Sequence, residues 1–326
     1  MNSPYDCFSI ADEAGFRHHA LQVFRHQATH VRVYSDYLAA IGTDPSTVTR
    51  WEEIPYLPVE LFKTHTVIDR DEPAGLVFTS SGTTGQQLSR HAVVDPGLYE
   101  ASFLKTFETF YGHPSRYSFL ALLPSYLERE GSSLVYMAER LMRLSGRKYS
   151  GFYLNDHATL AGVMKSLSTE GEPFILLGVT YALTDLARAY PGSYPGLIAM
   201  ETGGMKGRRK EVIREELHRE LCSLLDVENI HSEYGMTELF SQAYSDGQGR
   251  FRCPQWMRVR IRELDDPFAY VSEGRTGGIN ITDLANYHTC SFIATQDLGR
   301  HHGSGIFEVL GRFDDADARG CNLMVG

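Results

Sequence analysis

The sequence of 326 residues has no uninterrupted apolar stretch of about 18 residues, the length at which a helix could span a membrane. Its longest apolar run, residues 174–179, suits a buried strand instead. The N-terminus lacks a basic segment followed by an apolar one, so we expect no signal peptide and a cytoplasmic protein. With 42% hydrophobic and 22% charged residues, the chain should fold as one large domain or two unequal ones.

Clustered positive charge is also missing. The formal net charge of −10 argues against nucleic acid as a partner, because phosphate backbones are bound by grouped Lys and Arg. The five cysteines, at positions 7, 222, 253, 290 and 321, include no CxxC pair and no spacing typical of zinc ligands. The thirteen histidines show no metal-site spacing either. We therefore expect reduced thiols and assign no histidine a catalytic role.

The hydrophobic pattern predicts an α/β fold. Apolar positions at three- and four-residue steps predict an amphipathic helix over residues 16–41. The segments that follow alternate between strand and helix, which favours a parallel sheet covered by helices. The expected strands lie at residues 74–78, 117–123, 174–179, 197–200 and 227–230, and the expected helices at residues 132–145, 157–167, from Tyr181 onward, and 206–225. After about residue 251 the pattern changes to short strands that predict a small antiparallel sheet or barrel, at residues 257–264, 278–283, 291–295 and 306–310.

A glycine-rich polar segment follows the strand expected at residues 74–78. It consists of Ser80, Ser81, Gly82, Thr83, Thr84 and Gly85. Glycines let backbone N–H groups turn inward to form an anion site, and hydroxyl groups add hydrogen-bond donors for phosphate oxygens. The segment is not a Walker A loop, because no Gly-Lys-Ser/Thr ends it. By itself it favours a phosphate site over a polar surface turn, which stays an alternative.

A second polar segment has the sequence IHSEYGMTE, residues 230–238. It presents the ring of Tyr234, the hydroxyl of Thr237 and the carboxylate of Glu238 within a few positions. Such a set can stack on a base, contact a phosphate and hold Mg²⁺. Taken alone, a polar loop before a helix is an equally good interpretation.

Together, SSGTTG and YGMTE resemble the two signature motifs of the adenylate-forming superfamily, which includes acyl-CoA synthetases, firefly-type luciferases and peptide-synthetase adenylation domains. Residues 292–300 resemble the segment whose aspartate, here Asp297, holds the ribose hydroxyls. Residues 311–315 resemble the hinge before the mobile C-terminal domain. The resemblance implies an adenylate-forming N-terminal-type domain over residues 1–312, with a small β-barrel-like portion at about residues 251–312. A hinge-like tail, residues 313–326, would follow without the C-terminal domain.

Within that superfamily the sequence most resembles the acyl-protein synthetases of the LuxE type, which activate fatty acids in bacterial luminescence systems. Residues 54–63, 123–129, 202–207 and 319–323 carry this resemblance. It implies that the chain is a ligase that uses ATP and Mg²⁺ to convert a carboxylic acid, with a fatty acid as the expected class, to acyl-AMP. Pyrophosphate is released, and an acyl reductase is a possible acceptor partner by analogy.

The resemblance also assigns roles to single residues. The loop from Ser80 to Gly85 would hold the ATP phosphates, and Asp297 would accept hydrogen bonds from the ribose with Arg312 close to it. Thr237 would contact the α-phosphate and Glu238 would bind Mg²⁺. The remaining nucleotide-binding positions would be Tyr234 and Gly235 near the adenine, and Gly203 and Gly204, which would pass close to the base.

The sequence departs from the superfamily pattern at two places. A lysine usually follows the last glycine of the phosphate loop, but here the nearest cation is Arg90. The sequence also stops at Gly326, where superfamily members continue into a C-terminal domain that brings a catalytic lysine. This puts ordinary transfer to coenzyme A in doubt.

In acyl-protein synthetases a cysteine near the C-terminus carries the acyl group as a thioester, and Cys321 occupies the matching place. Arg319 would favour its nucleophilic thiolate form. Tyr126 and residues 178–180 are candidates for the wall of the acyl pocket. Two alternatives stay open: an acyl- or aryl-CoA ligase resembling phenylacetate-CoA ligase, in which Cys321 is incidental, and a nucleotide-binding protein without turnover.

Overall fold

The computed structural model describes residues 3–70, 72–80, 87–123, 131–154, 156–203 and 214–312. The chain divides into two compact units, which are described separately. Unit 1 comprises Met1–Ser102, Thr237–Ser241 and Arg252–Gly326, and unit 2 comprises Phe103–Met236 and Gln242–Phe251. The segment YGMTE therefore contributes Tyr234 to unit 2 and Thr237 to unit 1.

Unit 2 contains a parallel sheet. Its strands lie in the spatial order β5 (Gly151–Phe152), β4 (Ser118–Leu122), β6 (Phe174–Val179), β7 (Leu197–Thr202) and β8 (His231–Tyr234), with β9 (Ala243–Ser245) antiparallel to β8. Every residue of β4 and β6 is buried, as expected for parallel strands covered on both faces. The chain runs from β4 outward to β5 and then returns to β6 on the other side of β4. Such a reversal is where open α/β sheets bind ligands, at the carboxyl ends of the strands.

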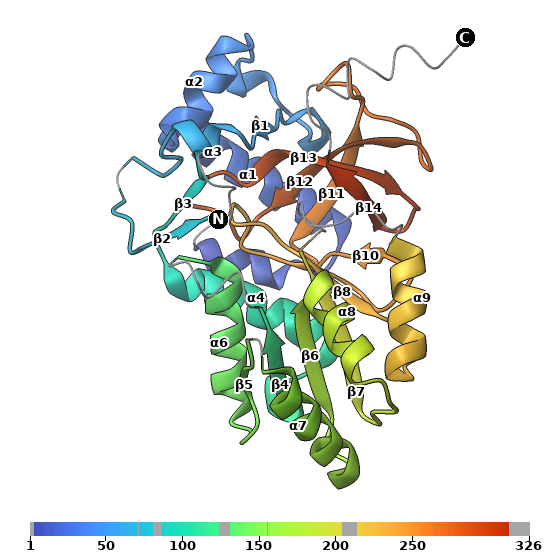
Figure 1. Cartoon of the computed structure of the whole chain (residues 1–326). Coiled ribbons are helices and arrows are strands. Elements are labelled where there is room, and N and C mark those ends of the chain that lie inside the picture. The colour runs from blue at the N-terminus through green and yellow to red at the C-terminus, as the bar shows by residue number, and fades with distance from the viewer. Residues whose placement is uncertain are drawn as a thin grey trace, which may run out of the picture. The chain divides into compact units, whose positions relative to one another are not determined.

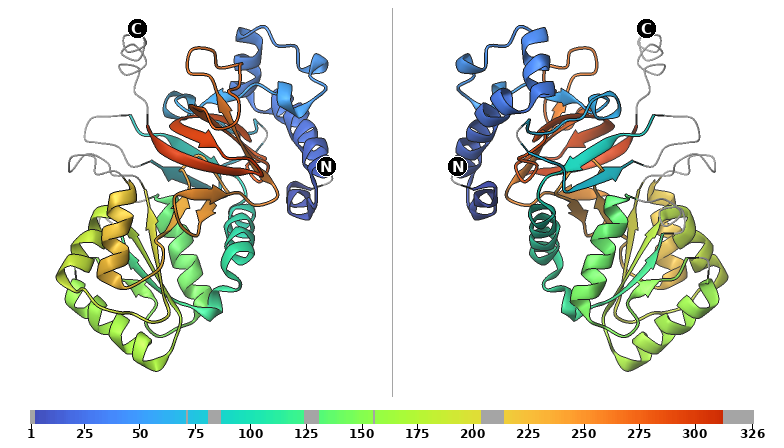
Figure 2. Two further views of the ribbon diagram at one scale, coloured as in Figure 1. Left: turned by 90° about the vertical axis from the view of Figure 1, so that its right-hand side faces the viewer. Right: turned by 90° about the vertical axis from the view of Figure 1, so that its left-hand side faces the viewer.

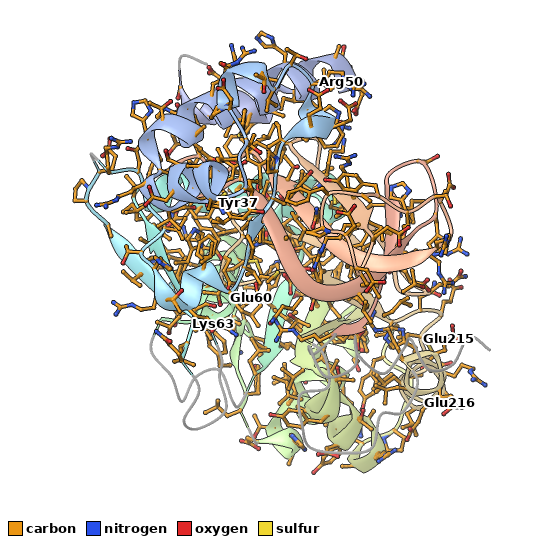
Figure 3. All side chains as sticks on the ribbon, turned by 90° about the horizontal axis from the view of Figure 1, so that it is seen from above. Tyr37, Arg50, Glu60, Lys63, Glu215 and Glu216 are labelled. Atoms are coloured by element: carbon orange, nitrogen blue, oxygen red, sulfur yellow. The ribbon has the colours of Figure 1, made fainter. Side chains whose placement is uncertain are left out.

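Helices cover both faces of this sheet. They are α6 (Ser133–Ser145), α7 (His157–Glu170), α8 (Thr180–Ala189) and α9 (Arg214–Leu225). In Figure 2, α8 and α9 lie on one face of the sheet and α6 on the other. Glu215 and Glu216 in the first turn of α9, labelled in Figure 3, place negative charge where the helix dipole favours it. Gly146 ends α6 in the left-handed conformation, with a φ of 61° that costs glycine little.

Unit 1 contains an antiparallel sheet (Figure 1). Its strands are β11 (Met257–Arg262), β12 (Thr276–Asp283), β13 (Phe292–His301) and β14 (Ile306–Arg312), paired in this order, and β1 (Leu57–Pro58) runs parallel to β13. A separate hairpin joins β2 (Leu76–Thr79) to β3 (Arg90–Val93). The antiparallel sheet expected after residue 251 is therefore present.

The remaining elements are α1 (Glu13–His30), α2 (Arg32–Ala40), α3 (Leu61–Thr64), α4 (Pro96–Tyr111), β10 (Arg250–Arg252) and the short 3-10 helices η1 (Pro4–Ser9), η2 (Pro45–Thr47), η3 (Trp51–Glu53) and η4 (Pro114–Arg116). The prediction of one helix over residues 16–41 is wrong, because Val31 interrupts it. Val31 is fully buried, has extended backbone angles and forms a bridge with Asp69. A tertiary contact thus overrides the continuous helical pattern.

The strand expected at residues 227–230 is also misplaced, because β8 begins only at His231. Asp226 adopts a φ of 52°, and the N–H of Val227 donates to the carbonyl oxygen of Cys222. Residues 226–230 are therefore used to end α9 and turn the chain. The strands expected at residues 174–179 and 117–123 are confirmed as β6 and β4. Within the described residues, no helix combines the length and apolar character needed to cross a membrane.

Candidate nucleotide site

The residues proposed from the sequence fall into three groups. Ser80, Thr237, Glu238, Asp297 and Arg312 lie in unit 1, and Gly203, Tyr234 and Gly235 lie in unit 2. The others lie outside the described residues: Ser81, Gly82, Thr83, Thr84, Gly85, Tyr126, Gly204, Arg319 and Cys321.

Ser80 directly follows strand β2 and is the first residue of the glycine-rich segment. Its N–H donates to the carbonyl oxygen of Ser89 at 3.0 Å, and its hydroxyl oxygen accepts from the N–H of Ser89, also at 3.0 Å. These two bonds hold together the positions that flank the segment. Arg90 follows in β3, opposite Thr79, and its side chain is exposed. Arg90 therefore remains a candidate cation beside the segment.

The backbone of Thr237 and Glu238 is held by buried side chains of unit 1. His91 is fully buried, and its Nδ1 lies 2.7 Å from the carbonyl oxygen of Thr237. Asn286, also fully buried, donates through Nδ2 to the carbonyl oxygen of Glu238 at 2.8 Å. The Nε2 of His91 lies 3.0 Å from Thr289 Oγ1 and 3.1 Å from Asn286 Oδ1. The two residues predicted to do the chemistry are thus fixed through their main chain.

Burial lowers the pKa of His91 to about 4, against the opposing effects of its bonds to Thr237 and Asn286. The imidazole is therefore neutral at pH 7. Because a carbonyl oxygen can only accept, the Nδ1 atom carries the proton that it donates to Thr237.

The next turn of this segment is bound by the fully buried carboxylate of Asp283. The N–H groups of Phe240 and Ser241 both donate to Oδ2 at 2.8 Å, and the Ser241 hydroxyl donates to Oδ1 at 2.6 Å. The N–H of Ala285 adds a bond of 3.2 Å to Oδ1. Burial raises the pKa of Asp283, and these donors act in the opposite direction. A single carboxylate therefore fixes the chain directly after Glu238.

The loop that carries Asn286 is itself supported by helix α1. Gln27 is fully buried and donates through Nε2 to the carbonyl oxygens of Asn286 at 3.0 Å and Tyr287 at 2.7 Å. Its Oε1 accepts from the N–H of Ser291 at 3.0 Å. The support for Thr237 and Glu238 thus reaches from the N-terminal helix through this loop.

Asp297 and Arg312 are brought together by the pairing of β13 with β14, in which they face each other. The Arg312 Nε lies 3.2 Å from Asp297 Oδ1, and their side chains are 52% and 11% exposed. Behind them, Arg262 donates to the carbonyl oxygens of Ile279 at 2.9 Å and Thr295 at 2.7 Å. Burial lowers the pKa of Arg262, while Asp297 and Glu60, which Figure 3 labels, oppose this effect. The pair therefore lies near a buried positive charge, with the guanidinium of Arg312 half-exposed.

In unit 2, the carboxyl ends of the parallel strands are joined by side-chain hydrogen bonds around Glu201. Its Oε1 accepts from Ser232 Oγ at 3.1 Å and lies 3.0 Å from His218 Nε2 and 3.2 Å from Arg214 Nε. Thr180 reaches Oε2 at 3.3 Å. Burial raises the pKa of Glu201, but these partners outweigh it, so the net pKa lies below the ordinary value. Glu201 is therefore a charged carboxylate that links several side chains at this edge of the sheet.

Gly203 and Tyr234 lie at the same edge. Gly203 has a φ of 69°, a conformation that favours glycine, and its carbonyl oxygen accepts from Thr180 Oγ1 at 3.3 Å. The Tyr234 ring meets the Phe251 ring at a centroid distance of 5.9 Å and an angle of 61°. This edge thus carries a turned backbone at Gly203 and an aromatic ring at Tyr234, the two features proposed from the sequence to lie near the adenine base.

Glu233 directly precedes Tyr234 and pairs across the sheet with Thr202. Its carboxyl accepts a short hydrogen bond from the Thr202 hydroxyl, and its side chain is buried. A Cβ atom at Gly235 would lie only 2.4 Å from Glu233 Oε1, so the carboxyl lies directly against this glycine. Burial raises the pKa of Glu233 to about 7, with Thr202 opposing the shift.

The supporting residues His91, Asp283, Asn286 and Glu233 were not identified from the sequence. His91, Asp283 and Asn286 lie far along the chain from the segment that they hold, so no short motif includes them. Glu233 directly precedes the motif YGMTE, which begins at Tyr234. The strand expected from the sequence ended at residue 230, whereas Glu233 lies in β8, so no local signal pointed to it.

No protein-family model matches the sequence. No curated protein matches it either. Solved structures are similar to the chain in fold. A 2-hydroxyisobutyryl-CoA ligase in complex with 2-HIB-AMP and CoA has a TM-score of 0.68 and 13% identity over 93% of this chain and 70% of its own.

ATP-bound MatB from Rhodopseudomonas palustris has a TM-score of 0.54 and 17% identity over 73% of this chain and 48% of its own. A long-chain-fatty-acid-CoA ligase from Archaeoglobus fulgidus has a TM-score of 0.54 and 14% identity over 79% of this chain and 55% of its own. The chain thus spans about half the length of the latter two. The expected fold class is confirmed: the chain has the α/β fold of adenylate-forming acyl-CoA ligases.

Proposed function

We propose that the protein activates a carboxylic acid with ATP. A carboxylate oxygen of the acid attacks the α-phosphorus, the bond to the bridging oxygen of the β-phosphate breaks, and pyrophosphate leaves with the bonding electrons. Acyl-AMP remains as the product. The observation that carries the proposal is the fixed backbone of Thr237 and Glu238, whose carbonyl oxygens are bound by His91 and Asn286. Such a step depends on positioning and on stabilisation of charge, which a rigid segment supplies.

In this proposal the hydroxyl of Thr237 donates a hydrogen bond to the α-phosphate. Ser80 and residues 81–85 contact the other phosphates. Glu238 would hold Mg²⁺, which would supply positive charge on the phosphate oxygens as pyrophosphate leaves. Glu238 is 4% exposed, and a carboxylate is the kind of oxygen ligand that this ion prefers. Among the described residues no group of three or more His, Cys, Asp or Glu could hold a metal. One carboxylate together with substrate phosphates is a common arrangement for Mg²⁺, so the residues fit it.

The resemblance also implies contacts to the nucleoside. Asp297 would accept from the ribose hydroxyls, with Arg312 neutralising part of its charge at 3.2 Å. Tyr234 and Gly235 would contact the adenine, and the turn at Gly203, followed by Gly204, would let the backbone approach the base. Each of these roles follows from the sequence resemblance.

Exchange of radioactive pyrophosphate into ATP, measured with the purified chain and a panel of carboxylic acids, tests the proposal. We expect acid-dependent exchange, with Glu238→Gln reducing the rate by at least about 100-fold, because the metal ligand loses its charge. Glu228→Gln, an exposed site, is the matched control. Absence of exchange with every acid would instead favour a nucleotide-binding protein without turnover.

We further propose that the acyl group passes to a thiol, with Cys321 as the carrier, as in an acyl-protein synthetase that takes fatty acids and hands the acyl group to a reductase. The sulfur would attack the acyl carbon, and AMP would leave. Residues 313–326 lie outside the described residues, so this step rests on the sequence resemblance. Labelled acyl retained on denatured wild-type protein but lost in Cys321→Ser is the expected result.

Transfer to coenzyme A is the second candidate. The observation in its favour is that the similar solved structures are CoA ligases, one of them holding CoA. CoA-dependent release of AMP by Cys321→Ser at the wild-type rate would support this candidate over the cysteine carrier.

A further inference from the structure

Glu233 is a buried carboxyl with few hydrogen bonds. Glu233 is 8% exposed, and among the described residues Thr202 is the one hydrogen-bond partner of its carboxyl. A carboxyl oxygen with no donor from the protein can accept a hydrogen bond from a ligand or a water molecule. In Glu233 this oxygen is Oε1, which lies against Gly235, because Thr202 bonds to Oε2.

Oε1 lies beside an exposed position that has no side chain. Gly235 is exposed, whereas Ser232, Glu233 and Tyr234 before it are buried. Gly235 has no side chain to cover the carboxyl, and any Cβ there would collide with Oε1 at 2.4 Å. A small polar group can therefore approach the carboxyl where larger residues would close the position. The location is the carboxyl end of a parallel strand, where α/β sheets bind their ligands.

The direction of the side chain indicates which ligand it can meet. Successive side chains of a strand point to opposite faces, so Glu233 faces away from Ser232 and Tyr234 in strand β8. Ser232 contacts Glu201 on its own face, while Glu233 contacts Thr202 on the other. If the Tyr234 ring takes the adenine, Glu233 is available to the second substrate, the carboxylic acid.

We propose that Glu233, oriented by Thr202, binds a hydrogen-bond donor on the chain of the acid, so that the preferred substrate carries a hydroxyl or amino group. This inference rests on the proposed acyl-adenylate chemistry and deepens it by naming the substrate class. A hydroxylated fatty acid satisfies it as well as a short hydroxy acid. The carboxylate of the substrate itself is a poor partner, because two carboxylates repel each other.

The protonation behaviour of Glu233 agrees with this role. Burial raises its pKa to about 7, so the free site is divided between the neutral and charged forms near neutral pH. A hydroxyl can hydrogen-bond either form, and an ammonium group favours the carboxylate. The neutral side chain of Gln242 is buried beside Gly235, with its Cγ 3.4 Å from an added Cβ. The titratable groups on the same face are His231, which contacts Tyr111 at 3.1 Å, and Tyr244, which faces Glu233 from β9. Neither supplies a positive charge at pH 7, because burial lowers the pKa of His231.

The test is pyrophosphate exchange with matched acids: butyrate, its β-hydroxy derivative and its β-amino derivative, and palmitate with its ω-hydroxy derivative. We expect wild-type kcat/KM to be at least about tenfold higher for one substituted acid than for its parent, the range for a hydrogen bond to a buried polar group. Glu233→Leu should lose this preference but keep exchange with the parent acid. Glu233→Gln should keep a preference for a hydroxyl and lose one for an amino group.

Two results would overturn the inference. One is an unchanged preference in Glu233→Leu, and the other is an equal loss of exchange with all acids, which would indicate a structural role. Circular dichroism verifies folding, and Thr202→Val provides a milder variant that leaves the carboxyl in place. Calorimetric binding of the same acids needs no turnover, so it decides the inference even if exchange is absent with every acid and the proposed function fails.

Discussion

Two buried carboxyl groups, Asp283 in unit 1 and Glu233 in unit 2, solve the same physical problem in different ways. Asp283 accepts hydrogen bonds from Phe240, Ser241 and Ala285, and both its oxygens have partners. Glu233 accepts from Thr202 through one oxygen. Burial disfavours the charged form of both groups and raises the pKa of each.

The number of hydrogen bonds distinguishes a carboxyl that stabilises the fold from one that can bind a ligand. A carboxylate with all its acceptor sites filled stabilises the segment that supplies the donors, and here that segment follows Thr237 and Glu238. A carboxyl with an open oxygen stabilises little by itself and gains its partner when a ligand arrives. We therefore interpret Asp283 as scaffold and Glu233 as part of the substrate site. The predictions below test this comparison.

The largest effect is expected for Asp283→Ala. It leaves the buried N–H groups of Phe240 and Ser241 without an acceptor, and each such loss costs about 1–3 kcal/mol. We expect the free energy of unfolding in urea to fall by about 3 kcal/mol or more. Asp265→Ala, at an exposed position, is the control and should change it by less than about 0.5 kcal/mol. Equal effects of the two variants would contradict the scaffold role.

Glu233→Gln should instead increase the free energy of unfolding at alkaline pH. The folded pKa of Glu233 is about 7 against an ordinary 4.5, so the folded chain binds more protons between these values and wild-type stability falls as pH rises through this window. The variant avoids that loss. At pH 8.5 it should be more stable than wild type by about 3 kcal/mol, and near pH 4 by almost nothing. Urea unfolding at the two pH values measures this, and equal differences at both would contradict the raised pKa.

His91 should make the free energy of unfolding depend on pH in the acid range. Its pKa is about 4 in the folded chain against an ordinary 6.5, so the unfolded chain binds more protons between these values and stability falls as pH is lowered. The loss should reach about 2 kcal/mol at pH 5. His91→Gln should remove this component, whereas His113→Gln, at an exposed position, should retain it. Identical pH profiles for the two variants would show that His91 is not the group responsible.

Gly235→Ala should cost about 1 kcal/mol, because the added methyl group collides with Glu233 Oε1 and the carboxyl must move. In a Glu233→Ala background the collision is gone, and the same substitution should cost less than about 0.5 kcal/mol. A double-mutant cycle by urea unfolding measures this coupling. Additive effects would indicate that the carboxyl does not rest on the glycine.

The smallest effect on stability is expected for Arg312→Ala, since its guanidinium is 52% exposed and such ion pairs contribute little. Unfolding should change by less than about 1 kcal/mol. The KM for ATP should nevertheless rise severalfold if Asp297 binds the ribose, because its charge is no longer balanced. A change in stability with no change in KM would contradict this assignment.

The sequence predicted the fold through local patterns. Alternation of apolar runs identified the parallel sheet, and β6 was located with its bounds because a fully buried strand is a continuous apolar run. Patterns failed where a distant contact decides the conformation. Val31 breaks a helix because it pairs with Asp69, and the bounds of β8 shifted because Asp226 adopts a positive φ at the end of α9.

The candidate site shows the same division. Short motifs led us to propose Thr237, Glu238, Asp297 and Arg312, and the pairing of β13 with β14 brings the last two together. The residues that hold this segment were not predicted, because His91 and Thr237 are 146 positions apart and Asp283 and Ser241 are 42 apart. Hydrogen bonds over such separations leave no spacing signal in one sequence. Glu233 was overlooked because the motif directs attention to its neighbours.

A crystal structure of the chain with a non-hydrolysable ATP analogue, Mg²⁺ and a hydroxylated acid tests the central claim most directly. The account predicts Mg²⁺ in contact with Glu238, the α-phosphate within hydrogen-bond distance of the Thr237 hydroxyl, and the hydroxyl of the acid on Glu233 Oε1. A nucleotide bound away from Thr237 and Glu238 would contradict the proposed chemistry. An acid bound with its hydroxyl away from Glu233 would contradict the proposed substrate class.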